Sequence, residues 1–289
     1  MTLRELQIQF HGQLNTLYDS DELTNVWRWW LSERLNCAPM QLTQTMNDVL
    51  SPQQIQQLES DVVRFSTGEP LQYILGNTEF YSLKLKCSPS ALIPRPETEE
   101  LVHWILEENH HHACHFLDIG TGTGCIPLAI KNQRPAWNVS ALDCSEEALK
   151  LARENALIHS LDCLWHNYDL LNGSDFPLNE PLTIISSNPP YIPMKEKGEM
   201  ASRVKEFEPN IALFVPDNDP LLFYRKIIEF SLRYCAPNGK VYVEIHENLS
   251  GEIVALFQQY DFANIELRKD LQGKERMVRA QRVSLSCET

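Results

Sequence analysis

The sequence predicts an α/β protein with a mostly parallel, seven-stranded sheet and a small all-helical domain before it. Seven short apolar segments follow residue 76, and helical patterns lie between the first five. This alternation is typical of a parallel sheet with helices on both faces. A glycine-rich turn follows the first segment, as in nucleotide-binding sheets. The chain before residue 76 repeats its apolar residues at helical spacing, so we expect a helical domain over residues 1–75 and a larger α/β domain over residues 76–289.

The clearest helix of the first domain is "SPQQIQQLESDVVRFSTG", residues 51–68. Ser51 suits the N-cap, Pro52 the first helical position and Gly68 the end. Apolar residues share one face of this segment and of "TNVWRWWLSERL": Ile55, Leu58, Val62 and Phe65 in the first, Trp27, Trp30, Leu31 and Leu35 in the second. Such stripes indicate packing within a small bundle rather than an aromatic ligand site.

The second domain opens with an extended segment or hairpin between Phe80 and Cys87, followed by a helix that begins near Pro96. The predicted strands are His115–Ile119, Asn138–Leu142, Cys163–Tyr168, Thr183–Ser187, Lys240–Ile245, Ala263–Arg268 and Arg276–Val283. Ser145 caps the helix after the second strand, and Asp219 opens the helix before the fifth. Only "DLQGKE" joins the last two strands, which is too short for a helical crossover, so they should form an antiparallel hairpin at the sheet edge.

Composition limits the classes of protein that this chain can belong to. Its 289 residues suit two domains, and 43% hydrophobic residues support globular packing. A formal net charge of -14 argues against stable nucleic-acid binding. No apolar run is long enough to span a bilayer, and the N-terminus lacks a signal-peptide core. The eight cysteines form no CxxC pair, so they indicate reduced thiols and a cytoplasmic protein.

The segment "FLDIGTGTGCIPLAI" places a glycine loop between a strand and a helix. Gly120, Gly122 and Gly124 let the backbone approach a ligand closely, and the helix N-terminus offers free N–H groups. The third glycine comes one residue earlier than in the dinucleotide fingerprint. Asp118 precedes the loop and suits an ammonium group better than a diphosphate. The spacing therefore favours a ligand with an amino-acid end, held by the loop that includes Thr121 and Thr123.

Two further acids follow predicted strands. Asp143 ends the second strand, where a ribose-binding acid belongs in a doubly wound fold. Asp169 ends the third, near the place of an adenine ring. Each could be only a turn residue. Together with Asp118 and the glycine loop they predict a nucleoside site at the carboxyl edge of the sheet.

The fourth strand ends in "SNPPYIP", where two prolines without N–H groups must stop the ladder. "DIGTGTG" and "ALDCSEEAL" resemble motifs of Rossmann-like S-adenosylmethionine-dependent methyltransferases, and "SNPPYIP" is similar to the NPPY motif of those that act on planar nitrogens. "GEPLQYILGNTEFY", "LIPRPETEELV", "EFEPNIALF" and "LLFYRKII" narrow the resemblance to the HemK/PrmC family of release factor glutamine methyltransferases. The chain departs from the family at "FVPDNDPLLFYR", at Leu170 and at His246.

The resemblance implies methyl transfer to the side-chain amide of the glutamine in the GGQ motif of peptide chain release factors, with S-adenosylhomocysteine as product. Asn188 and the Pro189 carbonyl would accept both N–H bonds of the substrate amide. Pro190 would hold the backbone extended, and Tyr191 would stack on the amide group. Asp118, the glycine loop, Asp143, Asp169 and Asn188 would bind the cofactor, and the helical domain would help hold the protein substrate.

Other functions share parts of these patterns. NPPY also occurs in nucleic-acid methyltransferases, which the negative charge disfavours. A non-catalytic cofactor-binding scaffold is disfavoured by the intact Asn188, and a nicotinamide oxidoreductase by the glycine spacing and Asp118. The "NHHHACH" segment, residues 109–115, lacks tetrahedral spacing with other ligands, so we expect a solvated loop there and no metal site.

Overall fold

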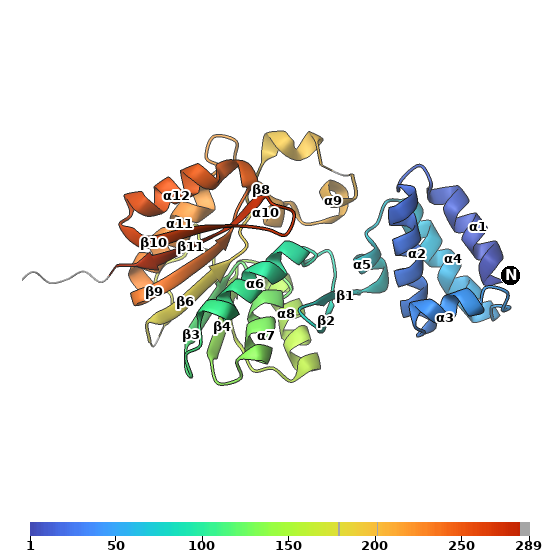
Figure 1. Ribbon diagram of the computed structural model, residues 1–289, viewed down its shortest axis with the longest axis horizontal. Coiled ribbons are helices and arrows are strands. Elements are labelled where there is room, and N and C mark those ends of the chain that lie inside the picture. Colours follow the sequence, from blue (N-terminus) through green and yellow to red (C-terminus); the bar gives the residue numbers. More distant parts are fainter. Residues whose placement is uncertain (179, 201, 284–289) are drawn as a thin grey trace, which may run out of the picture. The chain divides into compact units, whose positions relative to one another are not determined.

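The computed structural model describes residues 1–178, 180–200 and 202–283, and it contains two compact units (Figure 1). The helical unit consists of Met1–Asn77 and the distant helix α9 (Ser202–Phe207). The Arg203 guanidinium of α9 pairs with Glu22 at 2.6 Å and lies over the ring of Tyr18. This helix therefore packs with residues much earlier in the chain, which no pattern in the sequence indicated.

The helical unit contains α1 (Leu3–Leu14), α2 (Ser20–Leu35), α3 (Pro39–Gln44), α4 (Pro52–Ser66) and α5 (Leu71–Leu75). The helix predicted from Ser51 is confirmed as α4, and the Ser51 hydroxyl accepts a hydrogen bond from Gln54 N. The two predicted apolar stripes pack in one core, where Trp27, Trp30, Leu31, Leu58, Val62 and Phe65 are buried.

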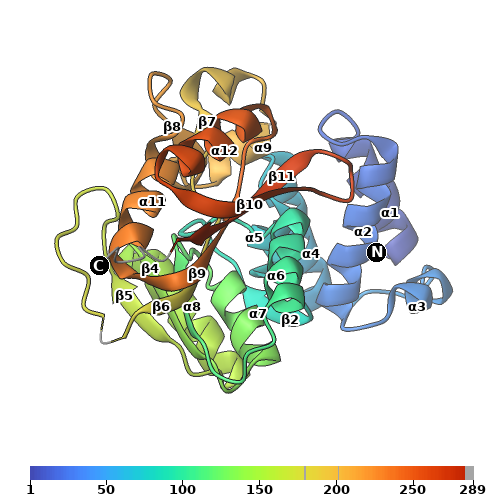
Figure 2. The ribbon, with the colours of Figure 1, turned by 60° about the vertical axis from the view of Figure 1, so that its left-hand side comes forward.

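All seven predicted strands are present, and they form one sheet: β3 (His115–Ile119), β4 (Asn138–Asp143), β5 (Leu164–Asn167), β6 (Leu182–Ser187), β9 (Cys235–Glu244), β10 (Phe262–Lys269) and β11 (Glu275–Arg282). Their order is β10-β11-β9-β6-β3-β4-β5. The first five strands of this sheet, β3, β4, β5, β6 and β9, pair in parallel. The pairs β9–β11 and β11–β10 are antiparallel. The predicted edge hairpin is therefore confirmed; Figure 2 shows it in red.

Helices cover both faces of this sheet. α6 (Pro96–Glu108) and α7 (Cys125–Gln133) share a core with Phe116 of β3, and α11 (Leu222–Tyr234) and α12 (Ser250–Gln259) share another with Leu117. Successive side chains of a strand point to opposite faces, so β3 is apolar on both. α8 (Glu146–His159) contacts β4 and β5. None of the described helices is long and apolar enough to span a bilayer.

Two expectations about connections are wrong. The sequence predicts helical patterns between the first five strands, but the described residues between β5 and β6 form no helix. "NGSDFP", with Gly173 and Pro177, disfavours one there. Asp219 does not open α11, which begins at Leu222; its carboxylate instead pairs with Arg225 at 2.9 Å.

Short elements complete the chain: β1 (Asn77–Phe80), β2 (Leu83–Lys86), β7 (Ile192–Pro193), η1 (Met194–Gly198), α10 (Asn210–Leu213), β8 (Phe214–Val215) and η2 (Glu247–Leu249). β1 and β2 form a two-stranded sheet across the segment predicted to be extended. Two of these regions matter for the site, because residues 90–92, 94 and 95 after β2 and Ile211 and Ala212 of α10 line the cavity of the α/β unit.

Candidate active site

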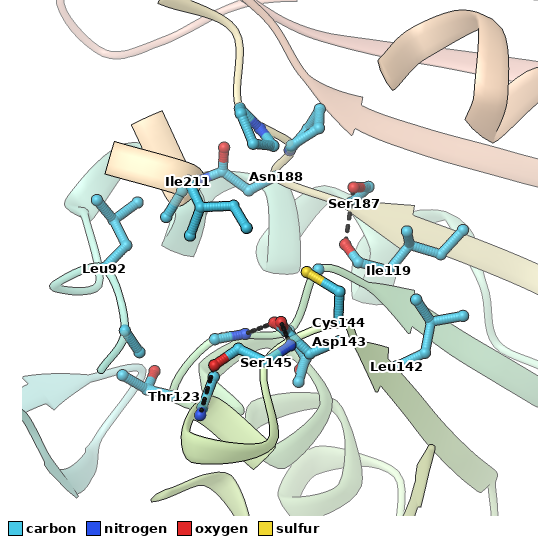
Figure 3. Close-up of a pocket in the computed structure, with 18 of the residues that line it drawn as sticks. Leu92, Ile119, Thr123, Leu142, Asp143, Cys144, Ser145, Ser187, Asn188 and Ile211 are labelled. Carbon is cyan, nitrogen blue, oxygen red and sulfur yellow. Dashed lines mark hydrogen bonds between the residues drawn. The ribbon is translucent and has the colours of Figure 1, made fainter. Parts of the chain in front are cut away.

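A cavity of about 220 Å³ lies in the α/β unit where β3, β4 and β6 end (Figure 3). The carboxyl ends of parallel strands meet at one edge, which is where open α/β sheets bind ligands. The glycine loop, the end of β4 and Asn188 line it, and Leu92 and Ile211 add apolar wall from two other segments. The structure thus brings most of the predicted site residues together.

The glycine loop is anchored to β4 through its backbone. The N–H groups of Gly120 and Thr121 donate to the Leu142 carbonyl, at 2.9 and 3.1 Å. Gly124 is the N-cap of α7 and has a φ of +80°, in the left-handed region that favours glycine. A Cβ there would lie only 3.1 Å from the Trp165 ring. The loop therefore needs glycine at this position for its backbone conformation and for its packing.

Asp143 lies on the wall formed by the end of β4, and Asn188 borders the other side of the cavity (Figure 3). One carboxylate oxygen accepts from Gly122 N and the other from Ser145 N, both at 2.9 Å. Burial raises the pKa of Asp143, and these backbone bonds oppose the rise. Each oxygen keeps a further lone pair for a hydroxyl group, so the geometry fits a ribose.

Asp169 also lines the cavity, with Tyr168 and Leu170 beside it. Its carboxylate accepts from Leu171 N and from the Asn172 side chain, both at 2.9 Å. The bond from Asn172 holds the pKa of Asp169 below its usual range. Leu170 supplies apolar surface at this end.

Asp118 lies behind the cavity wall. It is 1% exposed, and the Ser186 hydroxyl donates to its Oδ1 at 2.6 Å. Burial raises the pKa of Asp118 to about 7. The nearby Ser186 and Thr121 hydroxyls oppose this rise, but Asp118 Oδ2 and the hydroxyls of Thr121 and Thr123 make no hydrogen bond of ordinary geometry among the described residues. A direct contact between Asp118 and a ligand stays a prediction, but these three polar atoms leave hydrogen-bonding capacity beside the loop for a polar ligand group.

Asn188 follows β6 and is held by its side chain. Its Nδ2 donates to the Thr98 hydroxyl at 3.0 Å. Pro189 and Pro190 line the cavity beside it. Tyr191 does not line the cavity that the described residues form: its hydroxyl donates to Glu244 at 3.0 Å, and it packs in the core beside α11. Stacking of Tyr191 on a substrate amide therefore stays a prediction that this arrangement does not favour.

Several residues of the site had no role assigned from the sequence. Thr98 and Arg95 lie in "IPRPETE", which carried the resemblance without individual roles. Glu208, from "EFEP", is 4% exposed; it pairs with Arg95 at 2.6 Å and accepts from Ile93 N at 3.2 Å. This pair joins two segments that line the cavity. A charged residue of opposite sign in each motif was the available signal, but nothing local shows that the two motifs meet.

The cavity has the groups that a nucleoside with an amino-acid end requires. Asp143 offers two acceptors, Leu142 and Ile119 offer apolar surface, and unpaired polar atoms lie at the glycine loop. A methyltransferase from Pyrococcus furiosus has a similar fold, with 17% identity, a TM-score of 0.52, and coverage of 70% of this chain and 90% of that one. Residues 98–206 match the methyltransferase small domain. The fold and the site define a Rossmann-like S-adenosylmethionine-dependent methyltransferase.

The whole chain narrows this class further. Residues 5–76 match the PrmC N-terminal domain. The release factor glutamine methyltransferase of Flavobacterium psychrophilum is 38% identical over 283 residues, which is 96% of this chain and 99% of that protein. The Lactococcus lactis enzyme of the same name is 39% identical over 263 residues, 91% and 94% of the two chains. The chain belongs to the family of release factor glutamine methyltransferases.

Proposed function

We propose that this protein transfers a methyl group from S-adenosylmethionine to the side-chain amide nitrogen of the glutamine in the GGQ motif of release factors. The observation that carries the proposal is the bond from Asn188 Nδ2 to Thr98, which holds one end of the carboxamide inside the protein. The other end, Oδ1, is then the acceptor available to a substrate –NH₂ group.

An amide nitrogen is a poor nucleophile because its lone pair is delocalised into the carbonyl group. Catalysis must therefore come chiefly from positioning, with the reacting atoms about 3 Å apart. Asn188 Oδ1 and the Pro189 carbonyl can accept one N–H bond each. Pro189 is buried and the Asn-Pro-Pro backbone is stiff, so both acceptors are held in place. A hydroxyl group has only one hydrogen to donate and cannot satisfy both.

Bound S-adenosylmethionine supplies an electrophilic methyl group on a sulfonium sulfur. The lone pair of the substrate nitrogen would form the new N–C bond, and the electrons of the S–C bond that breaks would remain with the sulfur of the S-adenosylhomocysteine product. The alkylated nitrogen then loses a proton, so no strong base is needed. In this scheme Asp143 fixes the ribose through its two carboxylate oxygens, while Asn188 and Pro189 hold the nitrogen at the other side of the cavity.

The test is incubation with methyl-labelled S-adenosylmethionine and a release factor, ribosomal RNA or DNA. We expect label on the release factor alone, since the charge of -14 disfavours a polyphosphate substrate. The matched control is the same release factor with its GGQ glutamine changed to alanine, which should accept no methyl group. Faster labelling of either nucleic acid would reject the proposed substrate but not the cofactor.

We assign the helical unit to docking of the release factor, and we propose that the protein acts in the cytoplasm. A chain without residues 1–75 should bind the cofactor normally and methylate the whole release factor poorly. That truncation also removes Glu22 and Tyr18, the partners of Arg203. The matched control is therefore the full chain with Arg203→Ala, which loses this contact only. If the two variants are equally impaired, the effect comes from α9 and not from a docking surface on residues 1–75.

A further inference from the structure

A chain of two hydrogen bonds, one partly buried and one buried, lies behind Asn188. Asn188 Nδ2 donates to Thr98 Oγ1 at 3.0 Å, and Thr98 Oγ1 donates to Glu244 Oε2 at 2.7 Å. Thr98 belongs to the first turn of α6, and Glu244 is the last residue of β9. They are 2% and 1% exposed. Two elements and the segment after β6 thus form one connected path that ends on the carboxamide next to the cavity.

The path has a direction that chemistry fixes. The Thr98 hydroxyl donates its proton to the Glu244 carboxyl group. The Thr98 oxygen is then the acceptor for its other neighbour, and only the –NH₂ end of Asn188 can supply a proton to it. A reversed carboxamide would place its carbonyl oxygen against the Thr98 oxygen with no proton between them, at the cost of an unsatisfied buried group.

Glu244 is surrounded so that it can serve as this acceptor. Its Oε1 accepts from the Tyr191 hydroxyl at 3.0 Å, so each oxygen has a donor. The charged groups that face it are the Arg276 guanidinium of β11, which favours the ionised form, and Glu97 of α6, which disfavours it. The Tyr224 hydroxyl of α11 donates to its backbone carbonyl at 3.2 Å. Burial raises the pKa of Glu244, while the bonds from Thr98 and Tyr191 lower it.

We propose that Thr98 and Glu244 are positioning residues that determine which end of the Asn188 carboxamide faces the substrate, and so make the site select an –NH₂ group. The proposal rests on the proposed function. With Nδ2 held by Thr98, Asn188 presents an acceptor, which suits an amide N–H. A reversed Asn188 presents a donor, which repels the same group. Thr98 acts only through Asn188.

The first test changes Thr98 to valine, which keeps the branched shape and removes the acceptor. We expect kcat on the release factor to fall about tenfold or more, because the amide is no longer oriented in the transition state. The dissociation constant for S-adenosylmethionine should stay within about twofold, since valine has nearly the same shape as threonine at the cavity wall. Thr98→Ser, which keeps the hydroxyl group, should have a kcat close to that of the wild type. The matched control is Thr183→Val on β6. The Thr183 hydroxyl accepts a hydrogen bond from His115 N at 3.3 Å, away from the path, so this variant should keep the wild-type kcat.

The second test separates positioning from a general structural role. In an Asn188→Ala background, Thr98→Val should cause no further loss of kcat, because residues that act through one bond are not additive. A further tenfold loss would overturn the proposal, as would an unchanged kcat in the single variant while the wild type methylates the release factor.

A third measurement is independent of the substrate. The side-chain –NH₂ resonances of Asn188, assigned by their absence in Asn188→Ala, should shift in Thr98→Val and keep their wild-type positions in Thr98→Ser and Thr183→Val. Resonances unmoved by Thr98→Val would refute the bond itself. If the wild type did not label the release factor but the resonances moved as expected, the proposed substrate would fail and the positioning of Asn188 would stand.

Discussion

Alanine at Gly124 and at Gly120 should have different consequences, although both positions belong to one loop. Gly120 has a φ of +71° and Gly124 a φ of +80°, so an L-residue is strained at both. The space around them differs. A Cβ at Gly120 meets no described atom within 4 Å, and Gly120 lines the cavity. A Cβ at Gly124 lies 3.1 Å from Ala152 Cβ and from the Trp165 ring.

The magnitudes follow from these contacts. Alanine in the left-handed region destabilises the folded state by about 1–2 kcal/mol. The lower conformational entropy of the unfolded chain offsets about 0.4–1 kcal/mol of this loss. Gly120→Ala should therefore lower the free energy of unfolding by about 1 kcal/mol. Gly124→Ala bears the same strain and adds overpacking of about 1–3 kcal/mol. Since Trp165 and Ala152 belong to β5 and α8, neither can move without disturbing the core.

Urea unfolding and thermal melting of the cofactor-free protein measure the loss of stability. Calorimetric titration with S-adenosylmethionine measures the change in cofactor affinity. We expect Gly124→Ala to melt several degrees below Gly120→Ala, at about 2–4 °C per kcal/mol. We expect Gly120→Ala to weaken cofactor binding, because its methyl group enters the ligand space. Equal melting temperatures, or unchanged cofactor affinity in Gly120→Ala, would refute the division of roles within the loop.

Three further substitutions test single residues. Asn188→Ala should reduce turnover by about two to three orders of magnitude, with cofactor affinity nearly unchanged; a loss under threefold in the methylation rate would remove this residue from catalysis. Asp143→Ala should weaken S-adenosylmethionine at least about tenfold, since charge-assisted bonds contribute about 1.5–3 kcal/mol each; calorimetry showing the wild-type dissociation constant would contradict the ribose contact. The pKa of Asp118 is raised from 3.8 to about 7 in the folded protein, so the native state keeps this proton to higher pH and loses stability as the pH rises between these values. Asp118→Asn should therefore gain stability relative to the wild type from about pH 4 to about pH 7, and a difference in urea midpoints that does not change with pH would exclude this titration.

Local patterns in the sequence were sufficient to predict the strands of the sheet and most of the residues that line the cavity. Strand segments, the glycine loop and the acids at strand ends are set by residues close together in the chain, through backbone conformation and alternation of side chains. Parallel strands then bring their carboxyl ends to one edge, which is why Asp143 and Asn188 could be assigned to one site before the fold was known.

The partners of those residues depended on the tertiary structure. Thr98 and Asn188 are 90 positions apart, and Thr98 and Glu244 are 146 apart, so no local spacing reports their contact. Tyr191 follows the motif directly, yet its hydroxyl is bonded to Glu244 instead of lining the cavity. Asp118 precedes the glycine loop, but its side chain is buried and does not line the cavity. By itself the sequence determined which chemical groups stand at the sheet edge; packing between distant segments decided which of their atoms face the cavity, because buried polar groups take the orientation that satisfies their hydrogen bonds.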